Sequence, residues 1–311
     1  MDGTILDLSA PVLPAYEEWI AQFAPFVAQE YEWSGLTPEL ERRPLASIVS
    51  QEEYGRLAHA VDERRCSQLV YASGGLRISG YLVRPARVTS PRPTILFARG
   101  GSRDFGSIGP LALLDFMALA DAGYVVIASQ YRGGPGSEGS DQFGGEDLQD
   151  LLNLVPLARA RTEVEIRNLF LWGVSRGGMM AALALRAGLD VRAVALRAPM
   201  VDLADTAASR PDMRARFEEL IPEYASDPEA GLTRRSAICW PDELRAPVLF
   251  LHGRDDQRVP VDQSLRLAAA LRARGNDVSL VVYERESHLL LLHRRNYLNA
   301  VAKWFERHRA L

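Results

Sequence analysis

The 311-residue sequence predicts an α/β fold, with a mostly parallel central sheet flanked by helices. From residue 94 onward, short and almost wholly apolar runs recur, and amphipathic helical patterns separate most of them. Strands that are apolar on both faces and alternate with such helices are typical of a parallel sheet covered on both sides. The apolar content of 47% is enough for the core of one large α/β domain.

The elements follow one another in a regular order. The segments 67–73 and 76–85 alternate in polarity and meet at Gly74-Gly75, which predicts a β-hairpin. Apolar runs then predict buried strands at 94–100, 124–130, 169–175, 191–197, 247–253 and 278–284. Helical patterns, with apolar residues three and four positions apart, occupy 111–123, 146–160 and 264–275.

Two segments depart from this alternation. Residues 1–65 interleave charged and apolar residues between prolines, and they predict an N-terminal helical extension. Residues 66–311 then form the main α/β domain. Within it, residues 200–245 are rich in charge and proline and predict a helical insertion.

Composition excludes several classes of partner. The formal net charge is −4, and Lys and Arg form no unbroken run, so no nucleic-acid partner is expected. No stretch approaches the roughly 20 apolar residues that cross a membrane. The N-terminus lacks a basic start followed by an apolar run, so we expect a cytoplasmic location. The sequence gives no indication of the oligomeric state.

Neither a metal nor another cofactor is predicted. No cluster of His, Cys and Asp has the spacing of metal ligands. Cys66 and Cys239 have neither ligand partners nor paired spacing, so both are expected to be buried thiols.

The stretch Gly173-Val174-Ser175-Arg176-Gly177 lies between an apolar strand and an Ala- and Leu-rich helix. Glycines two positions before and after a serine leave room for a tight strand-to-helix turn that exposes the hydroxyl. The alternative is a turn that contains a serine by chance. The flanking strand and helix favour a nucleophile elbow, with Gly173 and Gly177 in the turn and Ser175 as the nucleophile.

A serine nucleophile needs a base that a third group orients. In α/β hydrolases the acid and then the histidine follow the serine, each at the end of a later strand. Asp255 and Asp256 follow the predicted strand 247–253, and His288 follows the strand 278–284. The order alone predicts His288 as the base and leaves the two aspartates open.

The motif His252-Gly253-x-x-Asp256-x-x-Val259-Pro260, followed by Gln263-Ser264, resembles the acid loop of the prolyl oligopeptidase family of α/β hydrolases. The glycine-rich stretch 130–150, which contains Tyr131-Arg132-Gly133, is similar to a corresponding segment of that family. The resemblance covers residues 67–310. It implies an α/β-hydrolase fold, a serine peptidase that cleaves short peptides, and Asp256 as the acid.

Two features depart from the family. Residues 1–65 are too short for the β-propeller that screens substrates in the large members, and Ser287 stands where a glycine commonly precedes the histidine. His252 lies at the end of a buried strand, and we expect it to fix the acid loop rather than to act as the base.

An oxyanion hole needs two donors. The elbow supplies the N–H of Arg176, and the loop after residue 98 offers the N–H of Gly100, for which an ordinary glycine turn is the alternative. Arg99 either binds a substrate carboxylate or pairs with Asp104, and the pairing is favoured slightly. Tyr131 is a second candidate for substrate binding.

The expected reaction is hydrolysis through an acyl-enzyme, on a short-peptide or other small-molecule substrate, without a cofactor. The same machinery also hydrolyses esters, so a carboxylesterase is the alternative enzyme. A hydrolase relative that binds without catalysis is the alternative of another class. The extension and the insertion, with Trp19, Trp33 and Trp240, are expected to cover the pocket and set specificity.

Overall fold

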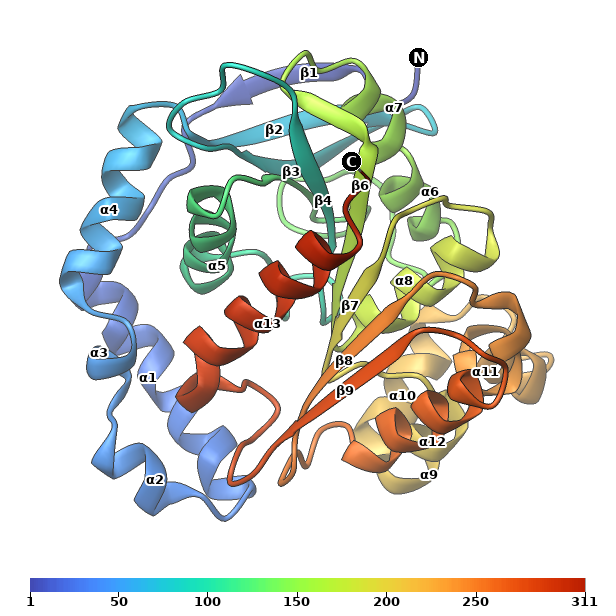
Figure 1. The fold of residues 1–311 in the computed structure, drawn as a ribbon. Coiled ribbons are helices and arrows are strands. Elements are labelled where there is room, and N and C mark those ends of the chain that lie inside the picture. The colour runs from blue at the N-terminus through green and yellow to red at the C-terminus, as the bar shows by residue number, and fades with distance from the viewer. Residues whose placement is uncertain (311) are drawn as a thin grey trace.

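A nine-stranded sheet forms the centre of the molecule in the computed structural model, which describes residues 1–310 (Figure 1). The strand order is β1-β2-β3-β5-β4-β6-β7-β8-β9. Their bounds are β1 Ile5–Ser9, β2 Cys66–Ser73, β3 Leu76–Val83, β4 Arg92–Ala98, β5 Val125–Ser129, β6 Val164–Val174, β7 Val194–Arg197, β8 Val248–Gly253 and β9 Val278–Tyr283.

The sheet has an antiparallel part and a parallel part. Strands β1, β2, β3 and β5 pair antiparallel, and the predicted hairpin joins β2 to β3. From β5 through β4, β6, β7 and β8 to β9, every neighbouring pair is parallel. The predicted mostly parallel sheet is therefore confirmed. Since the carboxyl ends of parallel strands meet at one edge, the loops after β4, β6 and β8 lie close together.

Helices cover both faces of the sheet and bury a separate apolar cluster on each. One face carries α6 Asp147–Leu152, α7 Leu154–Arg159, α8 Arg176–Arg186 and α12 Val261–Arg272. The other face carries α5 Pro110–Asp121 and α13 Arg294–Arg307. Elsewhere, short 3-10 helices lie at 237–239, 241–243 and 291–293. The predicted alternation of strands with helices places the catalytic candidates in loops at the carboxyl edge of the sheet.

The N-terminal extension is helical, as expected, over α1 Tyr16–Trp33, α2 Thr37–Arg42, α3 Leu45–Ile48 and α4 Gln51–Asp62. It is not helical throughout, because β1 pairs antiparallel with β2 and forms the edge of the sheet. Four of the five β1 residues are exposed, so the alternation that marks a half-buried strand is missing from its sequence. The extension therefore belongs to the sheet as well as to the helical layer.

The insertion consists of α9 Leu203–Ser209, α10 Pro211–Leu220 and α11 Pro228–Arg235, which lie beside α12 in Figure 1.

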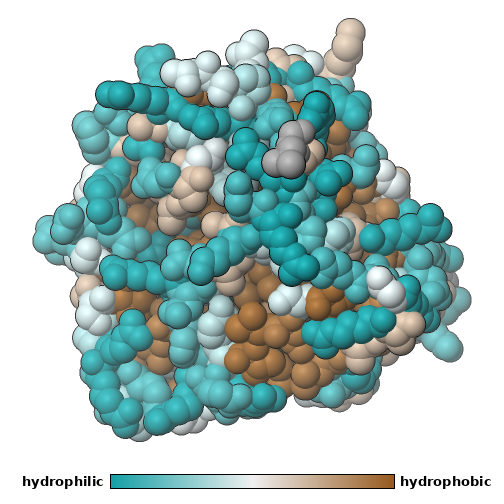
Figure 2. Space-filling model, viewed as in Figure 1, coloured by the Kyte–Doolittle hydropathy of each residue, from teal (hydrophilic) through white to brown (hydrophobic). Residues whose placement is uncertain are grey.

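Strand β9 forms the second edge of the sheet, and five of its six residues are half-buried. Figure 2 shows a hydrophobic area on this side of the molecule, in the region where Figure 1 draws β9. Among the described residues, no helix combines the length and apolarity that crossing a membrane requires.

Candidate functional site

Ser175 lies in the turn between β6 and α8, with a positive φ of 56°. A non-glycine residue with positive φ is strained, and this conformation is typical of a nucleophile elbow. The turn requires its glycines, because a Cβ on Gly173 would collide with the carbonyl oxygen of Gly177. A Cβ on Gly177 would collide with that of Ala98. The local sequence thus holds a half-exposed hydroxyl above the end of β6.

The loop after β8 places the carboxylate of Asp256 within hydrogen-bond distance of the His288 ring. Nδ1 of His288 lies 2.7 Å from Oδ2 of Asp256, whereas Asp255 makes no hydrogen bond with the ring. The other carboxyl oxygen of Asp256 accepts hydrogen bonds from the backbone N–H groups of Arg258 and Val259, at 2.8 and 2.9 Å. The Asp256 carboxylate is therefore held in one orientation toward the imidazole.

His252 completes this loop. Its Nε2 lies 3.0 Å from Oδ2 of Asp256 and 2.9 Å from the carbonyl oxygen of Val259, and its Nδ1 lies 2.7 Å from Oγ of Ser264. Burial opposes ionisation of the Asp256 carboxyl, but the charge of His288 and hydrogen bonds from both histidines hold its pKa well below the ordinary value. Asp256 is therefore a carboxylate at neutral pH.

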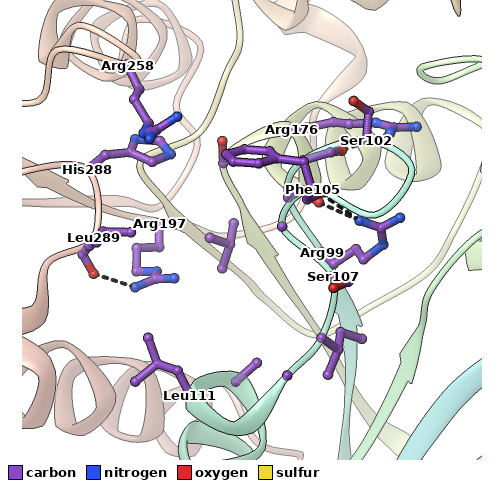
Figure 3. Close-up of a pocket in the computed structure, with 18 of the residues that line it drawn as sticks. Arg99, Ser102, Phe105, Ser107, Leu111, Arg176, Arg197, Arg258, His288 and Leu289 are labelled. Atoms are coloured by element: carbon purple, nitrogen blue, oxygen red, sulfur yellow. Dashed lines mark hydrogen bonds between the residues drawn. The ribbon is translucent and has the colours of Figure 1, made fainter. Parts of the chain in front are cut away.

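Ser175 and His288 line the same cavity, which has a volume of about 660 Å³. Within residues 1–310, the Ser175 hydroxyl and the His288 ring form no hydrogen bond, as is common for catalytic pairs without substrate. Figure 3 shows His288 beside Arg258 on one wall, with Arg99 and Phe105 on the opposite side. Ser175 and His288 thus line one cavity, and Asp256, which does not line it, is hydrogen-bonded to His288.

Two backbone N–H groups lie beside the serine. A Cβ on Gly100 would be 3.1 Å from the Cβ of Ser175, so the two residues are in close contact. Gly100 donates its N–H to no acceptor in the described part of the chain. Arg176 is the first residue of α8, so its N–H has no intrahelical acceptor. Both amides are therefore available to an oxygen of a bound substrate.

The side chain of Arg176 holds neighbouring loops together through ion pairs and hydrogen bonds. It is buried and forms ion pairs with Asp141 and Asp147, which precede or begin α6. Its guanidinium also donates to the carbonyl oxygen of Gly101. These contacts fix the backbone of the elbow and of the loop that contains Gly100.

Arg99 does not pair with Asp104, contrary to the favoured expectation. Its guanidinium is 1% exposed and donates to the carbonyl oxygens of Gly100, Gln130, Arg103 and Phe105. The arginine stabilises the curved loop 99–106, because three carbonyl groups of that loop turn inward to it, and it ties the loop to Gln130 after β5.

Tyr131 is fully buried and is absent from the residues that line the cavity. Trp19 lines the cavity, but Trp33 and Trp240 do not. Cys66 is buried as expected. Cys239 is exposed, contrary to expectation, because it ends a short turn on the surface of the insertion. No three His, Cys, Asp or Glu side chains in residues 1–310 are grouped to hold a metal ion.

Sequence reasoning missed the contacts that tie α1 to the catalytic loops. Glu30 pairs with Nε of Arg258, two residues after the acid. The hydroxyl of Tyr31 donates to Oε1 of Glu286, two residues before the histidine, at 2.5 Å. Glu286 also accepts hydrogen bonds from the N–H groups of Ser287 and His293. No local pattern predicts the contacts of Glu30 with Arg258 and of Tyr31 with Glu286, because these partners lie more than 200 residues apart in the chain.

Comparisons with known proteins show which family and fold the chain shares. The model of the prolyl oligopeptidase family matches residues 113–310. The chain is 29% identical over 225 residues to "Uncharacterized peptidase YtmA" of Bacillus subtilis, which covers 72% of the chain and 86% of YtmA. It is 28% identical over 320 residues to "Uncharacterized peptidase YuxL" of the same organism, covering 94% of the chain and 48% of YuxL.

Among solved structures, the acylaminoacyl peptidase of Pyrococcus horikoshii aligns with a TM-score of 0.67 and 22% identity, over 78% of this chain and 41% of that one. A puromycin-hydrolyzing peptidase of Mycobacterium tuberculosis aligns with the same TM-score and identity, over 75% and 37%. The chain thus spans less than half of these longer proteins, which share its α/β-hydrolase fold. Together with the match over residues 113–310, the fold shows that the chain belongs to the prolyl oligopeptidase family of serine peptidases.

Proposed function

We propose that this protein is a serine hydrolase that cleaves short peptides through an acyl-enzyme, with Ser175, Asp256 and His288 as its catalytic triad. The main support is the 2.7 Å hydrogen bond between His288 and Asp256 in a cavity that Ser175 also lines. Membership of a peptidase family supports the choice of peptides as the substrate class.

In the proposed reaction, Nε2 of His288 removes the proton from Ser175 as its oxygen attacks the substrate carbonyl carbon. Asp256 holds the imidazole in the tautomer with Nδ1 protonated and stabilises the imidazolium. The N–H groups of Arg176 and Gly100 bind the oxyanion. The imidazolium then protonates the leaving nitrogen, and water, activated by the same histidine, releases the acyl group from the serine.

A carboxylesterase is the second candidate. The cavity wall includes Trp19, Phe23 and Phe26 from α1, together with Phe97 and Phe116, so an apolar acyl group also fits it. A binding protein without catalysis is disfavoured by the positive φ of Ser175, since a strained serine serves no purpose in binding alone.

Fluorophosphonate labelling tests the enzyme class. We expect stoichiometric modification of the wild-type chain at Ser175 and none of Ser175→Ala, whose turnover should fall by about 10⁴- to 10⁶-fold. Absence of labelling and of hydrolysis in the wild-type chain would support the binding protein instead.

A substrate panel separates the two enzyme candidates. Aminoacyl anilides, dipeptide amides and short acyl esters are compared on one preparation by kcat/KM. A peptidase hydrolyses the amides as well as the esters, because His288 protonates the leaving nitrogen. Hydrolysis of the esters alone would identify a carboxylesterase.

A further inference from the structure

Arg197, at the end of β7, is an arginine in the cavity wall that forms no ion pair in the described structure. Of the other arginines around the cavity, Arg99 donates to backbone carbonyl oxygens, and the rest are paired with carboxylates. These pairs are Arg176 with Asp141, Arg210 with Asp212, Arg216 with Glu219 and Arg258 with Glu30. Arg197 therefore supplies positive charge that no carboxylate within 4.0 Å neutralises.

Its guanidinium is nevertheless held in place. Nη1 donates to the carbonyl oxygen of Leu289 at 2.7 Å and to the hydroxyl of Tyr297 at 3.4 Å. The guanidinium carbon lies 4.9 Å from the centre of the Tyr297 ring, in a cation–π contact. Figure 3 shows the side chain extending from its strand toward Leu289, with Leu111 beyond it on the neighbouring wall.

The opposite edge of the guanidinium lacks partners. Nε is buried without a hydrogen-bond acceptor, and Nη2 has none in residues 1–310. Leaving a buried donor without an acceptor costs free energy, so an acceptor oxygen at this edge of the guanidinium would be stabilising. The Nε and Nη2 donors of arginine form the parallel fork that binds both oxygens of a carboxylate.

Asp115, which shares the Tyr297 hydroxyl with Arg197, does not fill this role. Asp115 accepts hydrogen bonds from Nε of Arg294 at 2.6 Å and from the Tyr297 hydroxyl at 2.5 Å. It forms no ion pair with Arg197, and it reaches that residue only through the shared hydroxyl of Tyr297. Asp115 is thus occupied by its own partners, while the fork of Arg197 stays open.

The position of Arg197 links this fork to the chemistry. Its carbonyl oxygen accepts a hydrogen bond from the N–H of Ser175 at 2.9 Å, so the two main chains are adjacent. Apolar side chains, including Val174 and Leu289, line the cavity around it. Because both side chains line the same cavity, one short substrate can place a carboxylate at Arg197 and a carbonyl at Ser175.

We propose that Arg197 is a specificity residue that binds a substrate carboxylate beside the scissile bond. This inference rests on the proposed function and adds the substrate class, which is an anionic peptide. The carboxylate is either the free C-terminus of a short peptide or an acidic side chain next to the cleaved bond.

The test measures kcat/KM for two matched pairs of peptides. The first pair differs only in a free or amidated C-terminus, and the second only in Glu or Gln beside the cleaved bond. The variant is Arg197→Met, which keeps the length and removes the charge. The control is Arg216→Met, which removes a carboxylate-paired arginine from the same cavity.

We expect the wild-type chain to prefer the anionic member of one pair, and that pair identifies the source of the carboxylate. Arg197→Met should lower the preference by about 10- to 100-fold, mainly through KM, because charge-assisted hydrogen bonds in a poorly solvated site contribute this much. Arg197→Lys should restore only part of it, since an ammonium lacks the fork. Arg216→Met should keep the ratio within about threefold.

A wild-type chain with no preference in either pair, or a preference that Arg197→Met retains, overturns the inference. If the protein then still reacts with the fluorophosphonate and hydrolyses neutral esters, the proposed function stands and only the role of Arg197 fails. If no preparation hydrolyses any substrate, the proposed function fails. Binding of benzoate, measured by calorimetry, then decides the inference: loss in Arg197→Met but not in Arg216→Met supports it, and equal binding or none overturns it.

Discussion

The N-terminal extension and the helical insertion both depart from the α/β alternation, and both border the cavity, but they are attached to the molecule differently. The extension lines the cavity with aromatic side chains of α1, and the end of that helix contacts the two catalytic loops. Tyr31 and Glu286, which join α1 to the histidine loop, are both fully buried. Movement of the extension would therefore displace His288.

The insertion is attached to helices and loops instead. The side-chain oxygen of Gln263, in α12, accepts hydrogen bonds from the N–H groups of Val201 and Asp202. Arg235, in α11, donates to the carbonyl oxygen of Phe143. The insertion is linked to the loop that contains Gly100 by an ion pair between the partly exposed side chains of Arg103 and Glu219, at 2.6 Å. Arg210 of the insertion also donates to the carbonyl oxygen of Arg258 in the acid loop, at 3.2 Å. The extension thus contacts both the acid loop and the histidine loop through side chains, whereas the insertion contacts the acid loop and borders the cavity.

The largest effect is expected at the link between the extension and the histidine loop. Glu286→Ala leaves the Tyr31 hydroxyl and two backbone N–H groups without their acceptor in a buried site. We expect the free energy of unfolding to fall by about 3 kcal/mol, and kcat by at least about tenfold. Urea denaturation and ester hydrolysis measure the two. A kcat equal to wild type in the folded variant would show that α1 does not position His288.

A smaller effect is expected from the partner on α1. Tyr31→Phe removes one hydroxyl from this contact and should cost about 1–2 kcal/mol of stability, with a several-fold fall in kcat and an unchanged KM. Tyr16→Phe is the matched control, because its hydroxyl donates to Val49, which also lies in the extension. Equal kcat values for the two variants would show that the Tyr31 hydroxyl contributes to stability and does not position His288.

A weaker effect is expected from the insertion. Arg103→Gln breaks the ion pair with Glu219, and partly exposed pairs contribute about 0–1 kcal/mol. We expect KM for peptides to rise at most about fivefold while kcat is retained, and the difference to shrink in 0.5 M salt (about a 4 Å screening length). A fall in kcat at constant KM would mean that the insertion also positions catalytic groups.

The smallest effect concerns the two thiols, of which Cys66 packs beneath the extension and Cys239 lies in the insertion. Cys66 packs in the apolar cluster shared with α4 of the extension, and burial raises the pKa of its thiol to about 12. Cys239 is exposed on the insertion. Partial burial and the charge of Asp202 also raise the pKa of the Cys239 thiol. Because Cys239 is nevertheless exposed, we expect a disulfide reagent at pH 8 to modify it in the native protein and Cys66 only after unfolding. Rapid modification of native Cys239→Ser would show that the extension opens.

The sequence predicted the elements that depend on local patterns. Alternating polarity identified β2 and β3, and apolar runs identified β4 to β9. The glycine spacing around Ser175 reflects collisions that any side chain at Gly173 or Gly177 would cause. The chain order placed His288 and two candidate acids at the correct strand ends. The choice of Asp256 came from the family resemblance, because two adjacent aspartates cannot be separated by spacing alone.

Other features depend on distant parts of the chain and gave no such signal. Strand β1 is formed by pairing with β2 rather than by its own pattern, and Arg99 is satisfied by backbone carbonyls that sequence does not reveal. The open fork of Arg197 is likewise visible only once the partners of the other cavity arginines are known. Such contacts follow from tertiary packing, which overrides local preference.

Strand β1 has a practical consequence for anyone who shortens this chain. Removing residues 1–65 would take away the hydrogen-bonding neighbour of β2, whose outer N–H and C=O groups would then face solvent along residues 68–72. A bare strand of that length can pair with the same strand of a second molecule. Fragments that begin at the α/β domain are therefore expected to self-associate, and their altered catalysis would report aggregation as much as the loss of a substrate-binding wall.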